Sequence, residues 1–239
     1  MRGNEYGVPM RSGDSALFPM PEVAALEPPA GFAERVAALG VAVPDSAIAQ
    51  VGDYLARLLA MNERMNLTAI EDPVAAWERH VLDAWTLLPL LAGLPVGARL
   101  LDVGSGGGVP GIPLAIARPD LAVTLVEATQ KKAAFLEAVV ASLGLSNVRV
   151  HARRAEELSR GELRRTFDVV TARAVARLAK LIPLTAPFLR PGALLLLVKG
   201  QRADEELLEA TSVLRARGLV HERTVATPTG RIVVLRARD

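Results

Sequence analysis

The sequence contains no cysteine, and this absence excludes several kinds of chemistry at once. A chain without thiols can form no disulfide framework, no thiolate nucleophile and no zinc site built on cysteine. Its three histidines, His80, His151 and His221, lie far apart, and no spacing typical of metal ligands links them. We therefore expect neither a metal site nor a cysteine- or histidine-based nucleophile.

Long apolar runs and aromatic residues are also scarce. The most continuous apolar run, Ala193–Val198, is far shorter than the ~20 residues that a helix needs to cross a bilayer. Residues 1–15 lack the apolar core of a signal peptide. The sequence thus predicts a cytoplasmic protein with no membrane contact. Aromatic residues make up 4% of the chain, so few are available to stack on RNA bases, and we expect Trp77 and Trp85 in the core.

Charge is nearly balanced overall but is unevenly distributed. The formal net charge is +2, whereas the stretch from Arg149 to Arg190 holds ten basic residues against four acidic ones, a local excess of six positive charges. Clustered cations favour binding to a polyphosphate backbone. They are equally typical of a solvated surface in a chain that uses arginine in place of lysine, and the sequence alone leaves both interpretations open.

The chain does have the length and apolar content for a sizeable core. With 239 residues, 51% of them apolar, it accommodates one ordinary α/β domain and a small extension. Residues 1–20 are rich in Gly, Pro, Ser and Met without periodicity, which predicts a flexible arm. We expect a helical extension over residues 21–95 and the main domain over residues 96–239.

The extension shows helical periodicity. A short helix is predicted at 32–39 and a strong one at 45–65, where apolar residues recur every three or four positions. A third helix begins at Asp72, an N-cap acid followed by proline at the first helical position. Because these helices precede every strand, we expect them to cover one side of the later sheet.

From Arg99 onward, short apolar runs alternate with helical patterns. Strands are predicted at 99–103, 121–126, 147–151, 167–172 and 193–198, and helices at 111–118, 129–143, 178–187 and 203–217. Such alternation indicates a parallel sheet covered on both faces. Residues 219–226 and 231–236, joined by a Pro-Thr-Gly turn, predict an antiparallel hairpin. The predicted fold is α/β and Rossmann-like, with a seven-stranded, mainly parallel sheet that ends in this hairpin, the arrangement of class I methyltransferases.

The most informative segment is Leu101–Ile116, LDVGSGGGVPGIPLAI, in which a strand breaks into a glycine-rich loop before a helix. Such loops let the backbone approach a nucleotide closely, although they also arise as plain tight turns. Asp102 helps to decide which nucleotide, because a carboxylate so near the loop would repel an anionic pyrophosphate. It would attract the sulfonium and ammonium groups of S-adenosylmethionine. We therefore favour an S-adenosylmethionine site.

In open α/β sheets ligands bind at the carboxyl ends of the strands, so the residue after each strand is a candidate. Glu127 follows the second strand, where a carboxylate can accept both ribose hydroxyls of an adenosine. Ala155 and Glu156 follow the third strand, in position to flank the adenine ring.

Two cations, Arg173 and Lys199, follow the fourth and fifth strands. Because a lone buried charge is costly, each is expected to have a partner. That partner is either an acid, Asp102 or Glu127, or a phosphate of the methyl acceptor.

Asn66, His80 and Asp83 are the polar residues of interest in the extension. His80 and Asp83 lie three positions apart on a predicted helix and share a face. From spacing alone, this predicts a local hydrogen bond between them that has no function.

Several motifs of this chain together resemble one bacterial family. Besides LDVGSGGGVPGIPLAI they are VEATQKKAAFL (126–136), RAEEL (154–158), ARAVA (172–176), VKGQ (198–201), MNLTAI (65–70) and RHVLDA (79–84). Over about residues 45–235 the chain is similar to the ribosomal RNA small subunit methyltransferase G family, also called glucose-inhibited division protein B. Generic class I methyltransferases share the glycine loop but not this combination.

The resemblance implies that a methyl group passes from S-adenosylmethionine to N7 of one guanine in 16S ribosomal RNA. The substrate would lie within the 30S subunit or an assembly intermediate, and the protein would be a monomer. The implied site residues are Gly104 and Val109 at the methionine part, Glu127, Ala128 and Thr129 at the ribose, Ala155 and Glu156 at the adenine, and Arg173 between cofactor and acceptor.

Guanine N7 already carries a lone pair, so the transfer needs no prior deprotonation, and alignment and electrostatics would carry the catalysis. Our hypothesis is that Arg173 and Lys199 contact a phosphate or O6, while Asn66 or Asp83 faces the base. Other classes of protein stay open at this point. They are a methyltransferase acting on another RNA, a small molecule or a protein, a non-catalytic module that senses an adenine nucleotide, and a dinucleotide-dependent oxidoreductase.

Overall fold

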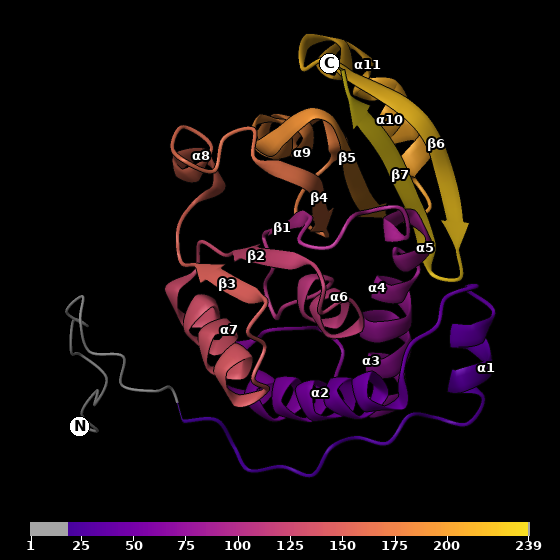
Figure 1. The fold of residues 1–239 in the computed structure, drawn as a ribbon, viewed down its shortest axis with the longest axis vertical. Coiled ribbons are helices and arrows are strands. Elements are labelled where there is room, and N and C mark those ends of the chain that lie inside the picture. Colours follow the sequence, from indigo (N-terminus) through magenta and orange to yellow (C-terminus); the bar gives the residue numbers. More distant parts are fainter. Residues whose placement is uncertain (1–18, 239) are drawn as a thin grey trace, which may run out of the picture.

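The computed structural model describes residues 19–238, so nearly all of the arm predicted over residues 1–20 lies outside the described residues. Seven strands form one sheet in the order β3-β2-β1-β4-β5-β7-β6 (Figure 1). They are β1 (Arg99–Val103), β2 (Ala122–Val126), β3 (Val148–His151), β4 (Phe167–Arg173), β5 (Leu189–Lys199), β6 (Leu219–Thr227) and β7 (Gly230–Ala237). The first five are parallel, and β7 lies antiparallel between β5 and β6. The predicted α/β fold with its closing hairpin is confirmed.

Helices cover both faces of the sheet, as parallel strands buried on two sides require (Figure 1). One layer contains α1 (Phe32–Ala37), α2 (Asp45–Met65), α6 (Gly111–Ala117) and α7 (Gln130–Ser142). The other contains α8 (Ala155–Leu158), α9 (Leu178–Thr185), α10 (Ala203–Glu209) and α11 (Thr211–Ala216). Alternate residues of a strand enter the two layers, so that Leu100 belongs to the core beneath α2 and α6 and Leu101 to the core beneath α9.

The third predicted helix is interrupted. It begins as α3 (Pro73–Ala76), where the Asp72 carboxylate accepts a capping hydrogen bond from the backbone N–H of Ala75 (2.7 Å). It then widens into the π-helical turn η1 (Trp77–Leu82), followed by α4 (Asp83–Trp85) and α5 (Leu88–Leu91). A π turn takes more residues than an α turn, so residues three apart in it do not share a face.

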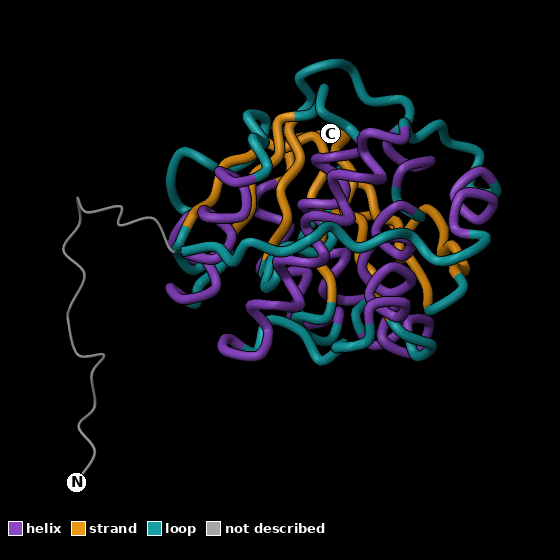
Figure 2. The backbone as a smooth tube through the Cα atoms, turned by 90° about the horizontal axis from the view of Figure 1, so that it is seen from below, coloured by secondary structure: helices purple, strands orange, loops and turns teal. Residues whose placement is uncertain are grey.

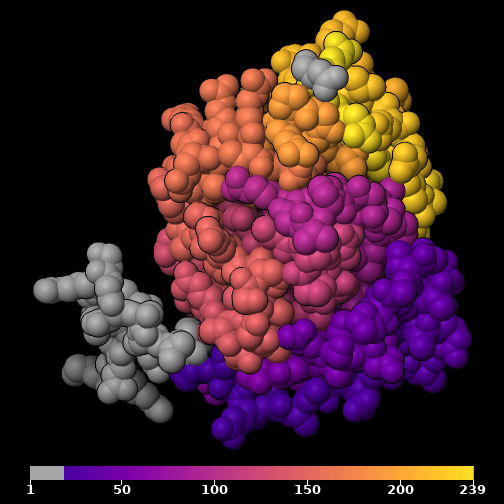
Figure 3. Space-filling model, viewed as in Figure 1, coloured from indigo at the N-terminus to yellow at the C-terminus, as the bar shows by residue number. Residues whose placement is uncertain are grey.

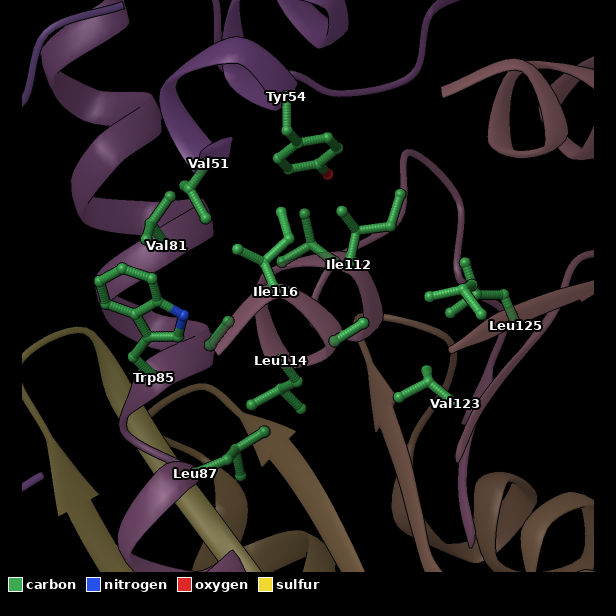
Figure 4. Packing of buried hydrophobic residues seen from close by; sticks show 14 of the residues in the cluster. Val51, Tyr54, Val81, Trp85, Leu87, Ile112, Leu114, Ile116, Val123 and Leu125 are labelled. Atoms are coloured by element: carbon green, nitrogen blue, oxygen red, sulfur yellow. The ribbon is translucent and has the colours of Figure 1, made fainter. Parts of the chain in front are cut away.

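Helix α6, directly after the glycine loop, lies at the centre of the larger core (Figure 4). Its buried Ile112 and Ile116 point toward α2 and the Val81–Trp85 side of the extension. The indole N–H of Trp85 donates to the carbonyl of Pro113 within α6 (2.9 Å). The glycine loop is therefore attached to a helix that is held firmly in place.

The N-terminal extension packs on the same side of the sheet as α6 and α7, and it forms the indigo end of the molecule in Figure 3. Ahead of α1, an extended segment runs beneath α2 (Figures 1 and 2), and Leu26 N–H donates to the carbonyl of Gly52 (3.1 Å). Gly52 permits this approach, since a Cβ there would lie 2.3 Å from the Leu26 oxygen. The expected cover of one side of the sheet is confirmed. Over residues 19–238 no helix is long and apolar enough to cross a membrane.

Candidate active site

The glycine-rich loop joins β1 to α6 at the carboxyl end of the parallel strands. The backbone N–H groups of Gly104 and Ser105 both donate to the carbonyl of Val126, at the end of β2 (2.8 and 3.1 Å). Gly104 has a φ of +73°, and a Cβ there would lie 2.7 Å from Val175 Cγ2. Glycine is therefore needed at this position for both the backbone conformation and the close packing.

Beside this loop lies a cavity of about 460 Å³, called here the first cavity. Its walls come from the loop, from the ends of β2 and β4, and from the extension. Of the predicted site residues, Gly104, Val109, Glu127 and Arg173 line it. Apolar side chains, loop backbone, the carboxylate of Glu127 and the cations Lys132 and Arg173 make a lining that suits a nucleoside with a charged tail.

Glu127 connects the loop to the start of α7. Its buried carboxylate accepts hydrogen bonds from the backbone N–H groups of Gly106 (2.9 Å) and Thr129 (2.7 Å). Each carboxylate oxygen keeps further acceptor capacity, which matches the two hydroxyls of a ribose. The free acceptor sites of the Glu127 carboxylate thus fit the ribose of an adenosine, the part of S-adenosylmethionine that this residue was predicted to bind.

Asp102 lies beneath the loop rather than in the first cavity. Its side chain is 1% exposed and accepts hydrogen bonds from Gly111 N–H (3.2 Å) and from the Thr171 hydroxyl (3.2 Å). Burial raises its pKa to about 6. The carboxylate therefore anchors the loop to α6 and β4 in this structure, and the direct contact expected with the sulfonium and ammonium groups is not what its geometry favours.

Besides Asp102, four residues of the predicted cofactor set lie outside the lining of the first cavity. Ala128 and Thr129 follow Glu127, and Thr129 reaches that carboxylate through its backbone. Ala155 and Glu156 begin α8, where Ala155 is buried and Glu156 is exposed. Contact of these residues with a cofactor stays a prediction.

Arg173 ends β4 and is held by the extension. Its Nη1 donates to the carbonyl of Arg79 (2.6 Å), and its Nη2 donates to Nδ1 of His80 (3.1 Å). Burial lowers the pKa of the guanidinium. Within residues 19–238 these are its hydrogen-bond partners, and the expected pairing with Asp102 or Glu127 is not formed.

On the other side of Arg173 lies a second cavity of about 500 Å³. Arg79 and Asp83 of the extension line it, together with Lys199 at the end of β5 and Thr229 in the hairpin turn. The Asp83 carboxylate accepts a hydrogen bond from the Thr229 hydroxyl, and burial raises the pKa of Asp83. Arg173 lines both cavities, so a ligand in one lies next to a ligand in the other.

Lys199 has a partner that the sequence did not indicate. Its Nζ donates to the Glu206 carboxylate (2.8 Å) and to the carbonyl of Ala176 (2.8 Å), and its side chain is 10% exposed. Of the two alternatives that the sequence left open, an acidic partner is present in the structure, but the acid is Glu206 of α10 and not Asp102 or Glu127. An ammonium has three donors, so one remains for the second cavity.

Asn66 is placed at the end of α2, outside both cavities. It is exposed and has a φ of +50°, a left-handed conformation that asparagine tolerates well at a helix end. Its predicted position facing the base is therefore not supported by the structure, whereas Asp83 does line the second cavity.

The predicted hydrogen bond between His80 and Asp83 is also wrong. His80 bonds instead to Arg173 and, through Nε2, to the Thr68 hydroxyl (2.9 Å), while Asp83 bonds to Thr229. His80 lies in the π turn η1 and Asp83 begins α4, so the regular α-helical spacing on which the prediction rested does not hold across this stretch.

Sequence reasoning missed the residues of the extension that build the first cavity. Thr68 lines it directly, and the Tyr54 hydroxyl donates to the carbonyl of Gly107 in the glycine loop (2.8 Å). Figure 4 shows the Tyr54 ring standing over α6 with its hydroxyl at the edge of the core. No signal in the sequence singled out Tyr54, Thr68 or Thr229 as a site residue.

The fold has counterparts among solved structures. It is similar to a SAM-dependent methyltransferase from Aquifex aeolicus (TM-score 0.54, 20% identity, 72% of this chain and 96% of that one). It is also similar to a ribosomal protein L11 methylase from Lactobacillus delbrueckii subsp. bulgaricus (TM-score 0.52, 15% identity, 67% and 79%). At these identities the likeness establishes the class I methyltransferase fold alone.

Sequence comparison is more specific. A curated ribosomal RNA small subunit methyltransferase G from Sorangium cellulosum is 65% identical over 227 residues, 95% of each chain. The protein of the same name from an Anaeromyxobacter species is 40% identical over 202 residues, 84% of this chain and 92% of that one. The family model described as rRNA small subunit methyltransferase G matches residues 47–233. The chain therefore belongs to the ribosomal RNA small subunit methyltransferase G family.

Proposed function

We propose that the first cavity binds S-adenosylmethionine and that the second cavity receives a guanine of 16S ribosomal RNA, which is methylated at N7. Membership of the family makes the chain an S-adenosylmethionine-dependent ribosomal RNA methyltransferase. The observation that carries the assignment of the two cavities is Arg173, which lines both and so marks where methyl donor and acceptor meet.

In the first cavity, Gly104 and Val109 would contact the methionine part of the cofactor and Glu127 its ribose. When bound, S-adenosylmethionine supplies a methyl group made electrophilic by the neighbouring sulfonium. Glu127 is already oriented by the N–H groups of Gly106 and Thr129, so its free acceptor sites are fixed before a ligand arrives. Asp102 supports the same loop from below.

In the second cavity, the acceptor base needs no general base. Neutral guanine has a lone pair on N7, and the base gains positive charge as N7 takes up the methyl group. A nearby carboxylate stabilises that charge, whereas an uncompensated cation would oppose it. Asp83 lines the cavity, and Lys199 is neutralised by Glu206. We assign Asp83 to the base and Arg173 and Lys199 to O6 or a phosphate.

We further propose that the substrate is 16S RNA within the 30S subunit or an assembly intermediate, and that the protein acts as a cytoplasmic monomer. The basic stretch Arg149–Arg190 supports an extended RNA contact of this kind.

Labelled S-adenosylmethionine offered to unmodified 16S RNA and to intact 30S subunits, followed by nucleoside analysis, tests the proposal. Label recovered as 7-methylguanosine is the expected result, and its relative yield on the two substrates identifies the preferred one. Label in another nucleoside would overturn the N7 assignment, and binding of the cofactor without transfer to either RNA would overturn the function.

Arg173→Ala tests the junction between the cavities. We expect kcat/KM for RNA to fall by tenfold or more, about 1.4 kcal/mol, with cofactor binding less affected. Arg35→Ala is the control, because it removes the same charge from a pair with Glu78 that lies outside both cavities and outside the basic stretch. An equal loss in both variants would mean that Arg173 acts only through general charge.

A further inference from the structure

His80 is a buried titratable group that the proposed transfer does not use. Its side chain is 2% exposed and lies between Arg173 of β4 and Thr68 of the loop after α2. It also borders the first cavity. A buried polar group with partners on two different elements fixes the relation between those elements.

The two partners determine where the imidazole carries its proton. An arginine can only donate, so Nδ1 of His80 must accept from Arg173 (3.1 Å). The proton of the neutral ring is then on Nε2, and it is donated to the Thr68 hydroxyl (2.9 Å). That hydroxyl also accepts the backbone N–H of Ile70 (3.0 Å). His80 therefore bridges Arg173 to the wall of the first cavity.

The charges around His80 favour this neutral form. Burial and the guanidinium of Arg173 lower its pKa to about 4, against a hydrogen bond with the backbone of Arg79 that raises the pKa; the side-chain charge of Arg79 lowers it to a smaller extent. The carboxylates of Asp83 and Asp102 are near enough to Arg173 to raise the pKa of its guanidinium, but they do not offset the effect on the ring.

The π turn supplies two acceptors for one guanidinium. Nη1 donates to the carbonyl of Arg79 and Nη2 donates to the ring of His80, so both terminal nitrogens of the guanidinium are hydrogen-bonded to this turn. A guanidinium has five N–H donors, which leaves three for a ligand. Arg79 and His80 both belong to η1, so one turn of the extension makes both contacts with Arg173.

We propose that His80 is a positioning residue, whose neutral Nε2–H tautomer holds the Arg173 guanidinium at the wall between the two cavities. The inference rests on the proposed function in one respect, namely that Arg173 contacts the acceptor RNA. His80 itself touches neither reacting atom and acts through Arg173.

Two isosteric replacements separate this role from simple packing. Asparagine places a carbonyl oxygen near the position of Nδ1, so His80→Asn keeps an acceptor for Arg173 but loses the donor to Thr68. Glutamine places an amide N–H near the position of Nε2, so His80→Gln keeps the donor to Thr68 but loses the acceptor for Arg173. We expect His80→Asn to keep kcat/KM for RNA within about threefold of wild type and His80→Gln to lose about tenfold.

A double variant shows whether the effect passes through Arg173. We expect His80→Gln combined with Arg173→Ala to be no worse than Arg173→Ala alone, because residues acting through one contact are not additive. The affinity for S-adenosylmethionine, measured by calorimetry, should stay near that of wild type in His80→Gln. Additive losses in the double variant, or equal losses with Asn and Gln, would overturn the proposal.

The ring nitrogen resonances of His80 give a readout that does not depend on turnover. In the wild-type protein we expect an unprotonated Nδ1 and a protonated Nε2, and Arg173→Ala should shift the Nδ1 resonance. A proton on Nδ1, or a resonance unchanged by Arg173→Ala, would overturn the positioning role whatever the substrate. Wild-type protein that forms no 7-methylguanosine while showing the expected tautomer would instead overturn the proposed function alone.

Discussion

Two buried groups beside the cavities, Asp102 and His80, are expected to make opposite contributions to the free energy of unfolding between pH 7 and pH 4, and these two contributions nearly cancel. Burial raises the pKa of Asp102 from 3.8 to about 6. Burial and Arg173 lower the pKa of His80 from 6.5 to about 4. The folded protein thus binds one proton more tightly and the other less tightly than the unfolded chain, so the two effects on stability have opposite signs.

The magnitudes follow from the size of each shift. Asp102 contributes stability that is present below pH 3.8 and is lost as the pH rises through about 6. The contribution of His80 has the opposite sign. As the pH falls from 6.5 toward 4, the imidazole takes up a proton in the unfolded chain but not in the folded protein, so stability is lost over this interval. Each of the two pKa values is shifted by about two units, which corresponds to about 3 kcal/mol, so the contributions of Asp102 and His80 nearly cancel.

Asp102→Asn uncovers the contribution of His80. The amide keeps the shape of the carboxyl group, its oxygen can accept from Gly111, and its NH2 can donate to Thr171, whose hydroxyl also faces the carbonyl of Leu101 (3.3 Å). We expect this variant to lose about 3 kcal/mol of stability between pH 7 and pH 4 relative to wild type. His80→Gln is expected to gain a similar amount over the same interval.

Urea unfolding followed by far-UV circular dichroism, at pH values between 7 and 4, measures these differences. All other carboxyl groups titrate alike in the three proteins, so subtracting the wild-type profile removes them. Parallel profiles for wild type and Asp102→Asn would refute the reasoning, since the buried carboxylate would then titrate like an exposed one.

Three further substitutions test the packing and bonding of the site. Gly111→Ala should destabilise the protein by about 1–3 kcal/mol in thermal or urea unfolding, because its Cβ would lie 2.3 Å from Leu125 Cδ2, whereas Gly93→Ala, with no atom within 4 Å, should not. Tyr54→Phe removes the donor to the glycine loop and should cost about 1 kcal/mol, with weaker cofactor binding by calorimetry. Thr229→Val removes the hydrogen bond to Asp83 that lowers the pKa of this carboxyl group. Asp83 then loses its proton at a higher pH, so the acid limb of the kcat/KM profile should move to higher pH.

The fold was largely predictable because its signals are local. The three- and four-residue periodicity of α2 predicted its observed bounds, Asp45–Met65. The fifth strand was predicted too short, from residue 193, because Pro191 and Gly192 are typical of a break. In the structure β5 begins at Leu189, and a shift of register against β4 accommodates these two residues.

The site was predictable only where a residue follows a strand. Parallel strands bring their carboxyl ends to one edge, and this logic placed Glu127, Arg173 and Lys199 at the cavities. The same logic could not identify the partners of Arg173 and Lys199, because His80 and Glu206 reach this edge of the sheet from helices elsewhere in the chain. Asn66, whose contact with the base stays a prediction, lies outside both cavities, and its polarity suits a helix end as well as a binding site.

The π turn explains why the extension and the sheet domain form a single site. It directs the Arg79 carbonyl and the His80 ring at Arg173, and the residue that follows it, Asp83, into the second cavity. Residues 79–83 therefore both orient the Arg173 guanidinium and place a carboxylate, that of Asp83, in the second cavity. The turn contributes His80 to the lining of the first cavity and Arg79 to that of the second. Under the proposed function, it therefore takes part in holding both the methyl donor and the acceptor.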